Sequence, residues 1–151
     1  MIDDIDIKII NSLVENSRRS TTKISEDLRI SNVATQQRIT KLEKQGIIRG
    51  YTAVIDYLEL GYKTVAYLGI FLEKAKNYHT VISELQQVPE ILEAHFTTGN
   101  YSIFVKICAK DNRHLMDILS DQIQSIDGIA RTETFISLQE GIHKELILKD
   151  P

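Results

Sequence analysis

The chain has 151 residues, 42% of them hydrophobic and 26% charged, and its formal net charge at neutral pH is −3. This composition is typical of a protein with one or two buried cores. No apolar run approaches the roughly 18 residues that a membrane-spanning helix needs. The chain begins MIDDIDIKII, which is acidic where a secretory signal would be basic. We therefore expect a cytoplasmic protein without a membrane segment.

The first predicted element is a helix that begins after Asp3 or Asp4 and ends near Asn16. An aspartate at this point can accept a hydrogen bond from a backbone N–H of the first turn. The apolar residues of the segment recur at helical spacing and form one stripe, which consists of Ile5, Ile9, Ile10, Leu13 and Val14. This stripe predicts a helix that packs against others through one face.

Residues 20–46 predict a short helix, a brief turn and a longer helix, which together are a helix-turn-helix. Ser20 can cap the first of these helices, and Ser31 can cap the second, which runs to Gln45 and stops at Gly46. The inward face of the second helix follows from the spacing i, i+4 and i+7 and consists of Thr35, Ile39 and Leu42. The motif indicates DNA as the partner.

The distribution of charge supports this interpretation, although the whole chain is acidic. Residues 17–50 contain eight basic and three acidic residues, an excess of five positive charges. Residues 63–151 contain nine basic and twelve acidic residues, an excess of three negative charges. A basic segment that coincides with a helix-turn-helix is typical of a nucleic-acid-binding unit.

The segment IIRGYTAVID follows the motif and alternates apolar and polar residues around Arg49-Gly50. This alternation predicts a β-hairpin, and a hairpin in this place would be the wing of a winged helix-turn-helix. The pattern of apolar and polar residues changes near Gly61. We therefore expect two domains, residues 1–62 and residues 63–151.

The second half predicts the order strand, helix, strand, strand, helix, strand, with a tight turn at Gly99-Asn100 between the two central strands. The expected ranges are 64–72, 78–87, 91–98, 101–109, 114–126 and 130–138. This order predicts a ferredoxin-like α+β fold, in which helices cover one face of a four-stranded antiparallel sheet.

The uncovered face of that sheet is expected to carry Tyr67, Phe71 or Phe104, and their aromatic character favours a second subunit as the cover. Residues 142–148 could add an edge strand across such a dimer. Cys108 is the one cysteine of the chain and lies in an apolar run. Because it has no partner for an intrachain disulfide, we expect a buried, inert thiol.

The whole chain resembles one family. The segments that carry the resemblance are IDIKII, ISNVATQQRITKLEKQGIIRGYTAVID, Leu60-Gly61, TTGNYSIF at 97–104 and IQSIDGIARTETFISLQ at 123–139. They are similar to the leucine-responsive and asparagine-responsive regulators (Lrp/AsnC), and the last two are most similar to the asparagine-responsive branch. The resemblance implies a transcription regulator whose N-terminal domain binds DNA as a dimer. It also implies a C-terminal domain that binds an amino acid where dimers meet, in assemblies up to octamers.

The longer helix of the motif is the candidate major-groove reader, because that groove admits an α-helix and displays a distinct pattern for each base pair. Gln36 and Gln37 can each bind adenine through both amide atoms, although a solvated glutamine explains either position equally well. Thr40 offers a hydroxyl, and Val33 an apolar contact to a thymine methyl. The other candidates, mainly phosphate contacts, are Ser31, Asn32, Arg38, Lys41, Lys44 and Arg49.

The resemblance implies an effector site around the Gly99-Asn100 turn, with asparagine as the best candidate ligand. Gln124 suits such a ligand because two side-chain amides can pair reciprocally. The expected contacts are Phe96, Thr98, Gly99, Asn100, Tyr101, Gln124, Thr132 and Thr134. The two threonines are also ordinary strand residues. Many relatives carry an acid at the position of Ser102, so its absence leaves the contact for the ligand's amino group open.

No cofactor, metal or catalytic residue is expected. His79, His95, His114 and His143 are widely spaced, and the sequence contains no nucleotide-binding glycine fingerprint and no nucleophile elbow. One enzyme class, the sirohaem decarboxylases, is similar in its two-domain architecture, and in that alternative His95 and Arg131 would be the candidate residues. The basic reader helix favours a DNA-binding regulator over this enzyme and over a plain amino-acid sensor.

Overall fold

The computed structural model describes residues 2–149, and contacts divide them into two compact units. The first unit comprises the residues up to Val54 together with the tail that begins at Ile142, and the second unit is Ile55–Gly141. The expected domain limits, 1–62 and 63–151, assign the tail to the second domain and stay a prediction. No helix within the described range is long and apolar enough to cross a membrane.

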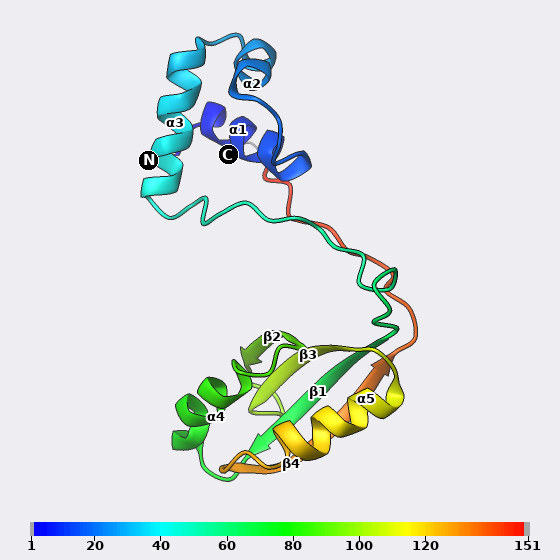
Figure 1. Ribbon diagram of the computed structural model, residues 1–151. Coiled ribbons are helices and arrows are strands. Elements are labelled where there is room, and N and C mark those ends of the chain that lie inside the picture. Colours follow the sequence, from blue (N-terminus) through cyan, green and yellow to red (C-terminus); the bar gives the residue numbers. More distant parts are fainter. Residues whose placement is uncertain (1, 150–151) are drawn as a thin grey trace. The chain divides into compact units, whose positions relative to one another are not determined.

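Three helices form the first unit, and α2 and α3 make the helix-turn-helix (Figure 1). The bounds of the helices are Asp4–Glu15 for α1, Thr21–Leu28 for α2 and Asn32–Lys44 for α3. The predicted caps are confirmed, since Asp3, Ser20 and Ser31 each accept a hydrogen bond from a backbone N–H of the following turn. After α3 the chain turns at Gly46, whose φ of 70° favours glycine.

The core of the first unit is small. Ile9, Ile24 and Leu42 are fully buried and come one from each helix. Thr35 is fully buried as well, although it is polar, and its hydroxyl donates a hydrogen bond of 3.1 Å to the Ser31 carbonyl. Because the preceding turn satisfies this hydroxyl, the inward face of α3 tolerates a threonine.

The predicted β-hairpin after α3 is wrong. Within the described residues, 47–56 form no strand, and the side chains of Tyr51, Val54 and Ile55 are 50%, 85% and 46% exposed. Gly50 also lacks the positive φ that two-residue hairpin turns use. A lone pair of strands is marginal in water without a core to cover. The first unit is therefore a helix-turn-helix without a wing.

The tail contacts α1. The side-chain amide of Asn11 donates to the Leu148 carbonyl at 2.8 Å, and its oxygen accepts from the Leu148 N–H at 2.9 Å. Residues 142–149 contain no strand. An edge strand across a dimer stays a prediction.

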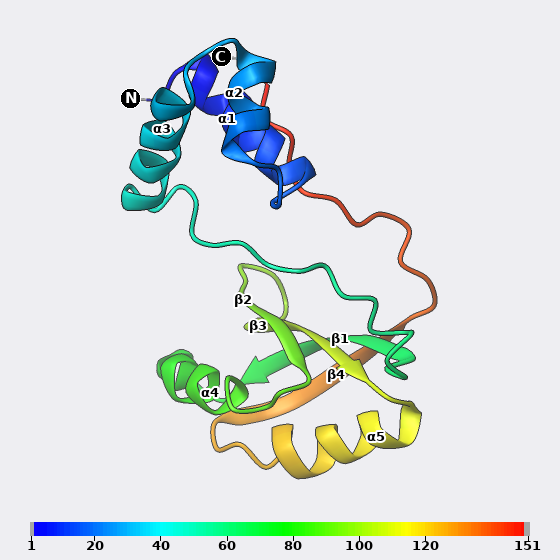
Figure 2. The ribbon, with the colours of Figure 1, turned by 45° about the horizontal axis from the view of Figure 1, so that its top comes forward.

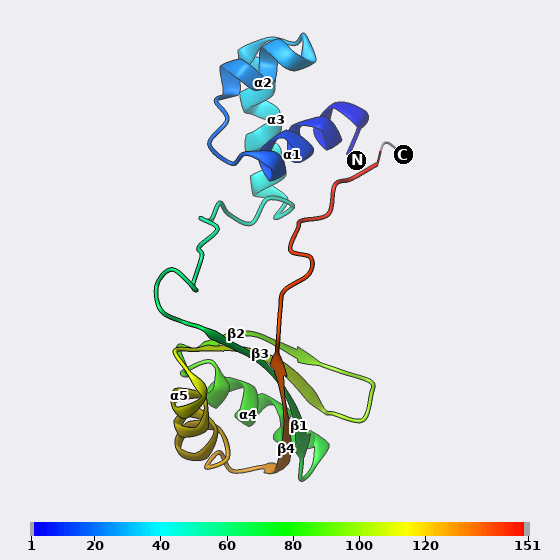
Figure 3. The same cartoon turned by 90° about the vertical axis from the view of Figure 1, so that its right-hand side faces the viewer.

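The second unit has the predicted fold. Its four strands form one antiparallel sheet in the order β2-β3-β1-β4, and α4 and α5 lie on the same face (Figures 2 and 3). The strands are β1 (Thr64–Leu72), β2 (Ile91–Phe96), β3 (Ile103–Ala109) and β4 (Ile129–Ser137). The helical segments are η1 (Ala75–Asn77), α4 (Tyr78–Leu85), α5 (Asn112–Asp117) and its π-helical continuation η2 (Ile118–Ile123).

The core of the second unit lies between the sheet and its helices. Alternate residues of β1, such as Leu68 and Ile70, are fully buried there against Leu85 and Ile118.

Cys108, near the end of β3, is 3% exposed, and burial raises the pKa of its thiol. The prediction of a buried thiol is therefore confirmed, and the raised pKa lowers the fraction of reactive thiolate.

The other face of the sheet carries aromatic side chains, as predicted. The rings of Tyr67 and Phe104 stack at 5.8 Å, and the ring of Tyr101 lies 5.2 Å from Phe71 and 6.1 Å from Phe135. These aromatic residues are only partly buried within the chain. A second subunit as the cover of this open face stays a prediction.

Candidate nucleic-acid interface and effector site

The exposed face of α3 lines a concave surface of about 890 Å³ in the first unit. Its lining contains no acidic residue and consists of Thr21, Thr22, Asn32, Val33, Gln36, Gln37, Thr40, Lys41, Lys44 and Gln45. Seven of the ten predicted DNA contacts are in this set. Val33 is 67% exposed, so an apolar side chain points outward among polar ones. We call this surface the reader groove.

Two residues of the reader groove, Thr21 and Thr22, lie in the first turn of α2 and were missed from the sequence. The Thr21 hydroxyl donates to Gln36 Oε1 at 3.2 Å, and Asn32 Nδ2 donates to Thr22 Oγ1 at 3.3 Å. A threonine pair directly after the Ser20 cap was the available signal. The role of this pair depends on the packing of α2 against α3, which residue spacing does not reveal.

Arg38 lies outside the reader groove and contacts α1. Its Nη1 is 2.8 Å from both carboxylate oxygens of Asp3 and 2.6 Å from Asp6 Oδ1. Asp6 is completely buried, and Lys41 Nζ lies 3.7 Å from its second oxygen. The backbone N–H of Asp6 and the Arg38 guanidinium together lower the pKa of Asp3. Arg38 thus has a structural role that the sequence did not indicate, and its predicted phosphate contact stays a prediction.

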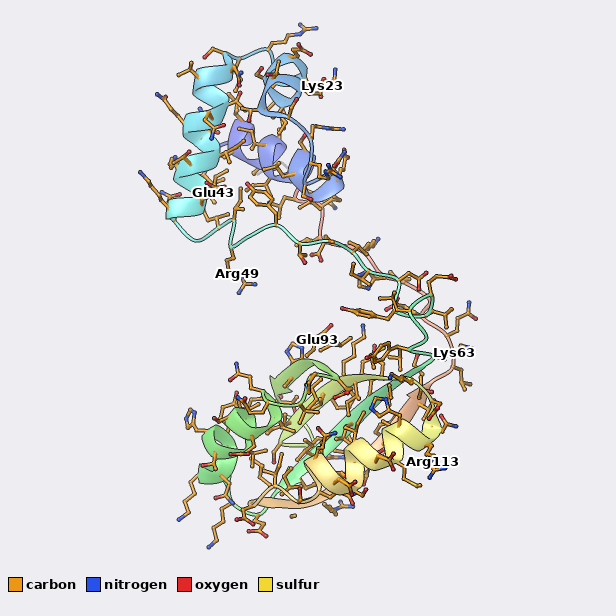
Figure 4. All side chains as sticks on the ribbon, in the orientation of Figure 1. Lys23, Glu43, Arg49, Lys63, Glu93 and Arg113 are labelled. Carbon is orange, nitrogen blue, oxygen red and sulfur yellow. The ribbon has the colours of Figure 1, made fainter. Side chains whose placement is uncertain are left out.

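The remaining predicted DNA contacts flank the groove. Ser31 caps α3 through its hydroxyl, which accepts from the Ala34 N–H at 3.1 Å. Arg49 lies in the exposed segment after α3, and its side chain points away from the helices (Figure 4). Glu43, the only acid of α3, accepts a hydrogen bond from the Tyr51 hydroxyl at 3.0 Å. A neutral donor therefore contacts the one negative charge of this helix.

The predicted effector residues fall on two faces of the sheet. In the register of β4 against β1, Thr132 pairs with Ile70 and Thr134 with Leu68, so both threonines belong to the helix-covered face. Gln124 follows η2 and donates to the Thr132 hydroxyl at 3.2 Å. These three residues therefore form one cluster on that face.

Tyr101 belongs to the opposite, open face. It lies in the loop between β2 and β3 together with Thr98, Gly99 and Asn100, which are all exposed. Phe96 is 59% exposed and lies 4.6 Å from the ring of Tyr78 on α4. The structure therefore brings Gln124, Thr132 and Thr134 together but separates them from Tyr101 by the thickness of the sheet.

An acidic residue that the sequence did not indicate lies beside Tyr101. Glu133 Oε2 accepts a hydrogen bond of 2.8 Å from the Tyr101 hydroxyl, and this bond, together with burial, raises the pKa of Tyr101. Arg131 lies 3.0 Å from Glu133 Oε1, with its guanidinium 3.8 Å from the centre of the Phe71 ring. The open face therefore carries a carboxylate. Ser102 binds the end of β1, because its backbone N–H donates to the Ile70 carbonyl and its hydroxyl accepts from the Leu72 N–H.

The residues of the enzyme alternative are not brought together. His95 is on β2 and Arg131 on β4, which are the two outer strands of the sheet. His95 lies 3.5 Å from Glu93, which is labelled at the edge of the sheet in Figure 4. No group of three or more potential metal ligands occurs among the residues that the structure describes.

Each unit matches a known family of domains. The model of the AsnC-type helix-turn-helix domain matches residues 2–43, and the model of the Lrp/AsnC ligand-binding domain matches residues 65–146. Regulatory protein AsnC of Haemophilus influenzae is 37% identical over 96% of this chain and 97% of the relative. The structure of E. coli AsnC superposes with a TM-score of 0.93 at 33% identity, covering 98% and 99% of the two chains.

A transcriptional regulator from Neisseria meningitidis, solved as a complex with L-Met, superposes with a TM-score of 0.91 at 25% identity, covering 99% and 97% of the two chains. A helix-turn-helix followed by a ligand-binding domain of this kind defines a DNA-binding transcription regulator rather than an enzyme. The chain belongs to the Lrp/AsnC family of transcription regulators.

Proposed function

We propose that this regulator recognises a specific operator through the reader groove, with Gln36, Gln37, Thr40 and Val33 facing base edges. The observation that carries the proposal is the composition of the groove: exposed amides, hydroxyls and lysines on one helix face, with no acid in its lining. The major groove of DNA admits one α-helix and is read by such side chains, while lysines bind phosphates. Lys41 and Lys44 are the phosphate contacts within the groove.

A single substitution tests base recognition. Gln37→Ala removes an amide for which the described residues offer no hydrogen-bond partner, so its loss does not disturb the fold. We expect specific binding to weaken by about 1–3 kcal/mol, while binding to non-specific DNA is unchanged. The measurement is the Kd of the full chain for a selected operator and for unrelated DNA. Equal losses on both would remove Gln37 from base recognition.

We further propose that a small amino acid, asparagine or a close relative, bound in the second unit modulates DNA binding. The likeness to AsnC supports asparagine, and the L-Met complex of the Neisseria relative makes methionine the main competitor. Gln124 suits asparagine because a side-chain amide can pair with another amide. Calorimetry with the twenty amino acids identifies the ligand, and no heat from any of them would refute the sensor function.

The effector site is proposed to need more than one chain. Gln124, Thr132 and Thr134 lie on one face of the sheet and Tyr101 on the other, so a single small ligand cannot contact all four in one chain. A dimer that assembles to tetramers or octamers would complete the site with residues of a neighbouring subunit. Modulation then requires that the ligand bind one arrangement of the subunits more tightly than another. A ligand that leaves the oligomer distribution unchanged in analytical ultracentrifugation would contradict this coupling.

A further inference from the structure

Two side-chain hydrogen bonds connect the first turn of α2 to α3 at the reader groove. The Thr21 hydroxyl donates to Gln36 Oε1 at 3.2 Å, and Asn32 donates to the Thr22 hydroxyl at 3.3 Å. Gln37, the neighbour of Gln36 in the same groove, has no hydrogen-bond partner among the described residues. The two adjacent glutamines therefore differ in one respect: the Gln36 side chain is held before any DNA is bound.

We infer that Thr21 is a positioning residue for base recognition: its hydroxyl holds the Gln36 amide in the orientation that reads one base pair of the operator. The inference rests on the proposed function of the reader groove. It adds that the specificity at this base pair depends on α2 as well as on α3.

The chemistry of the pair supports this role. A glutamine side chain has several rotatable bonds, and fixing it at an interface costs conformational entropy that a preorganised side chain has already lost. The bond from Thr21 uses one lone pair of Oε1, so both hydrogens of Nε2 are left for acceptors on a base edge, such as a purine N7. Gln36 thus presents its donors in a fixed direction, whereas Gln37 has to be ordered by the DNA.

The fold itself depends little on this hydrogen bond. The pair is exposed to solvent, and a neutral exposed hydrogen bond contributes little net stability, because water replaces either partner. The packing of α2 on α3 instead rests on buried apolar side chains, among them Ile24, Ile39 and Leu42. Removal of the Thr21 hydroxyl is therefore expected to change recognition without unfolding the unit.

The test compares variants of the full chain on an operator that the wild-type chain selects from random-sequence DNA. Thr21→Val removes the hydroxyl but keeps the branched shape, and Thr21→Ser keeps the hydroxyl. The Kd is measured for this operator, for versions with each base pair changed in turn, and for unrelated DNA. We expect Thr21→Val to reduce discrimination about 3- to 10-fold at one base pair, the one that Gln36→Ala also affects. Thr21→Ser is expected to behave as the wild type.

A double-mutant cycle separates positioning from direct contact. In a Gln36→Ala background, Thr21→Val is expected to have no further effect, because the hydroxyl has nothing left to position. Additive losses would overturn the inference. A loss that is uniform over all sequences, with a changed salt dependence, would also overturn it and would make Thr21 a phosphate contact.

Two controls make the outcome specific. Thr52→Val is the same chemical change at an exposed threonine outside the reader groove, and it should leave discrimination at the Gln36 base pair unchanged. Thermal unfolding of every variant excludes a folding defect. If the wild type selects no operator, the proposed base recognition fails and the inference fails with it. If Gln36→Ala and Gln37→Ala lose specificity and Thr21→Val does not, only the positioning role is refuted.

Discussion

The two units present their candidate binding residues in different ways. In the first unit most of the candidate DNA contacts lie on the exposed face of α3, and the reader groove, which the first turn of α2 also lines, is formed within a single chain. In the second unit the candidate ligand contacts lie on both faces of a sheet. The spacing of residues along the sequence determines which of them share one helix face. A ligand site whose residues lie on both faces of a sheet needs residues of a second subunit. If the proposed function holds, we expect base recognition to depend on residues of one protomer and ligand recognition to depend on the oligomer.

The largest effect is expected at Asp6, which anchors the reader helix. Its carboxylate is completely buried and binds Arg38 at 2.6 Å. Asp6→Asn removes the negative charge and leaves a partly buried guanidinium with Asp3 as its remaining carboxylate partner. Breaking a buried ion pair in this way is expected to lower the free energy of unfolding of the first unit by roughly 3 kcal/mol. Urea unfolding followed by circular dichroism measures the change.

The matched control for Asp6 is Asp3→Asn. Asp3 also contacts Arg38, but its side chain is 54% exposed, and asparagine keeps the helix cap. This variant should lose much less stability than Asp6→Asn. Similar losses of stability for both variants would show that burial of the Asp6 carboxylate does not determine its contribution to the stability of the first unit.

The second prediction concerns the open face of the sheet. Gly69 is covered by the Tyr101 ring, and a Cβ added there would overlap with the base of that ring. Gly69→Ala is expected to displace Tyr101, to cost about 1–3 kcal/mol of stability and to abolish amino-acid binding. Gly141→Ala is the control, because nothing lies within 4 Å of the added atom. Calorimetry that detects normal binding by Gly69→Ala would separate Tyr101 from the effector site.

The same contrast explains what the sequence could predict. Caps and turns are local, so Asp3, Ser20, Ser31 and Gly46 delimit the helices correctly. Apolar periodicity likewise predicted every strand of the second unit and the buried face of α3. The hairpin after α3 was predicted from alternation alone. It failed because alternation describes a possible strand, whereas pairing requires a partner and a covered face.

The residues that were missed all depend on tertiary contacts. The burial and pairing of Asp6 were not predicted, because a charge in an N-terminal acidic segment is ordinarily solvated. Its partner Arg38 is 32 residues away in the sequence. Glu133 was missed for a similar reason: its hydrogen bond to Tyr101 joins β4 to the loop before β3, 32 residues away in the sequence. Thr21 and Thr22 act only through the packing of α2 on α3. No residue spacing reveals such contacts.

The third prediction tests whether Lys41 of the reader groove binds a DNA phosphate. Lys41→Ala should weaken binding to the operator and to unrelated DNA alike, because a phosphate contact carries no sequence information. The slope of log K against log salt concentration should decrease by about 0.9. Fluorescence anisotropy over a series of salt concentrations measures it. Since Lys41 also lies 3.7 Å from Asp6, unfolding of the variant is measured in parallel. An unchanged slope would remove Lys41 from the phosphate contacts.

The smallest expected effect is a pH dependence confined to the first unit. The backbone N–H of Asp6 and the Arg38 guanidinium lower the pKa of Asp3 below its usual value of 3.8. A lowered pKa in the folded state means that Asp3 contributes stability above its unfolded pKa and loses it as the pH falls through the folded value. Stability of the first unit should therefore decrease below about pH 4, and Asp3→Asn should remove part of this decrease. Because Asp3 is exposed, the difference is expected to be small and to diminish in high salt. A decrease of the same size in wild type and variant would show that Asp3 does not cause the acid sensitivity.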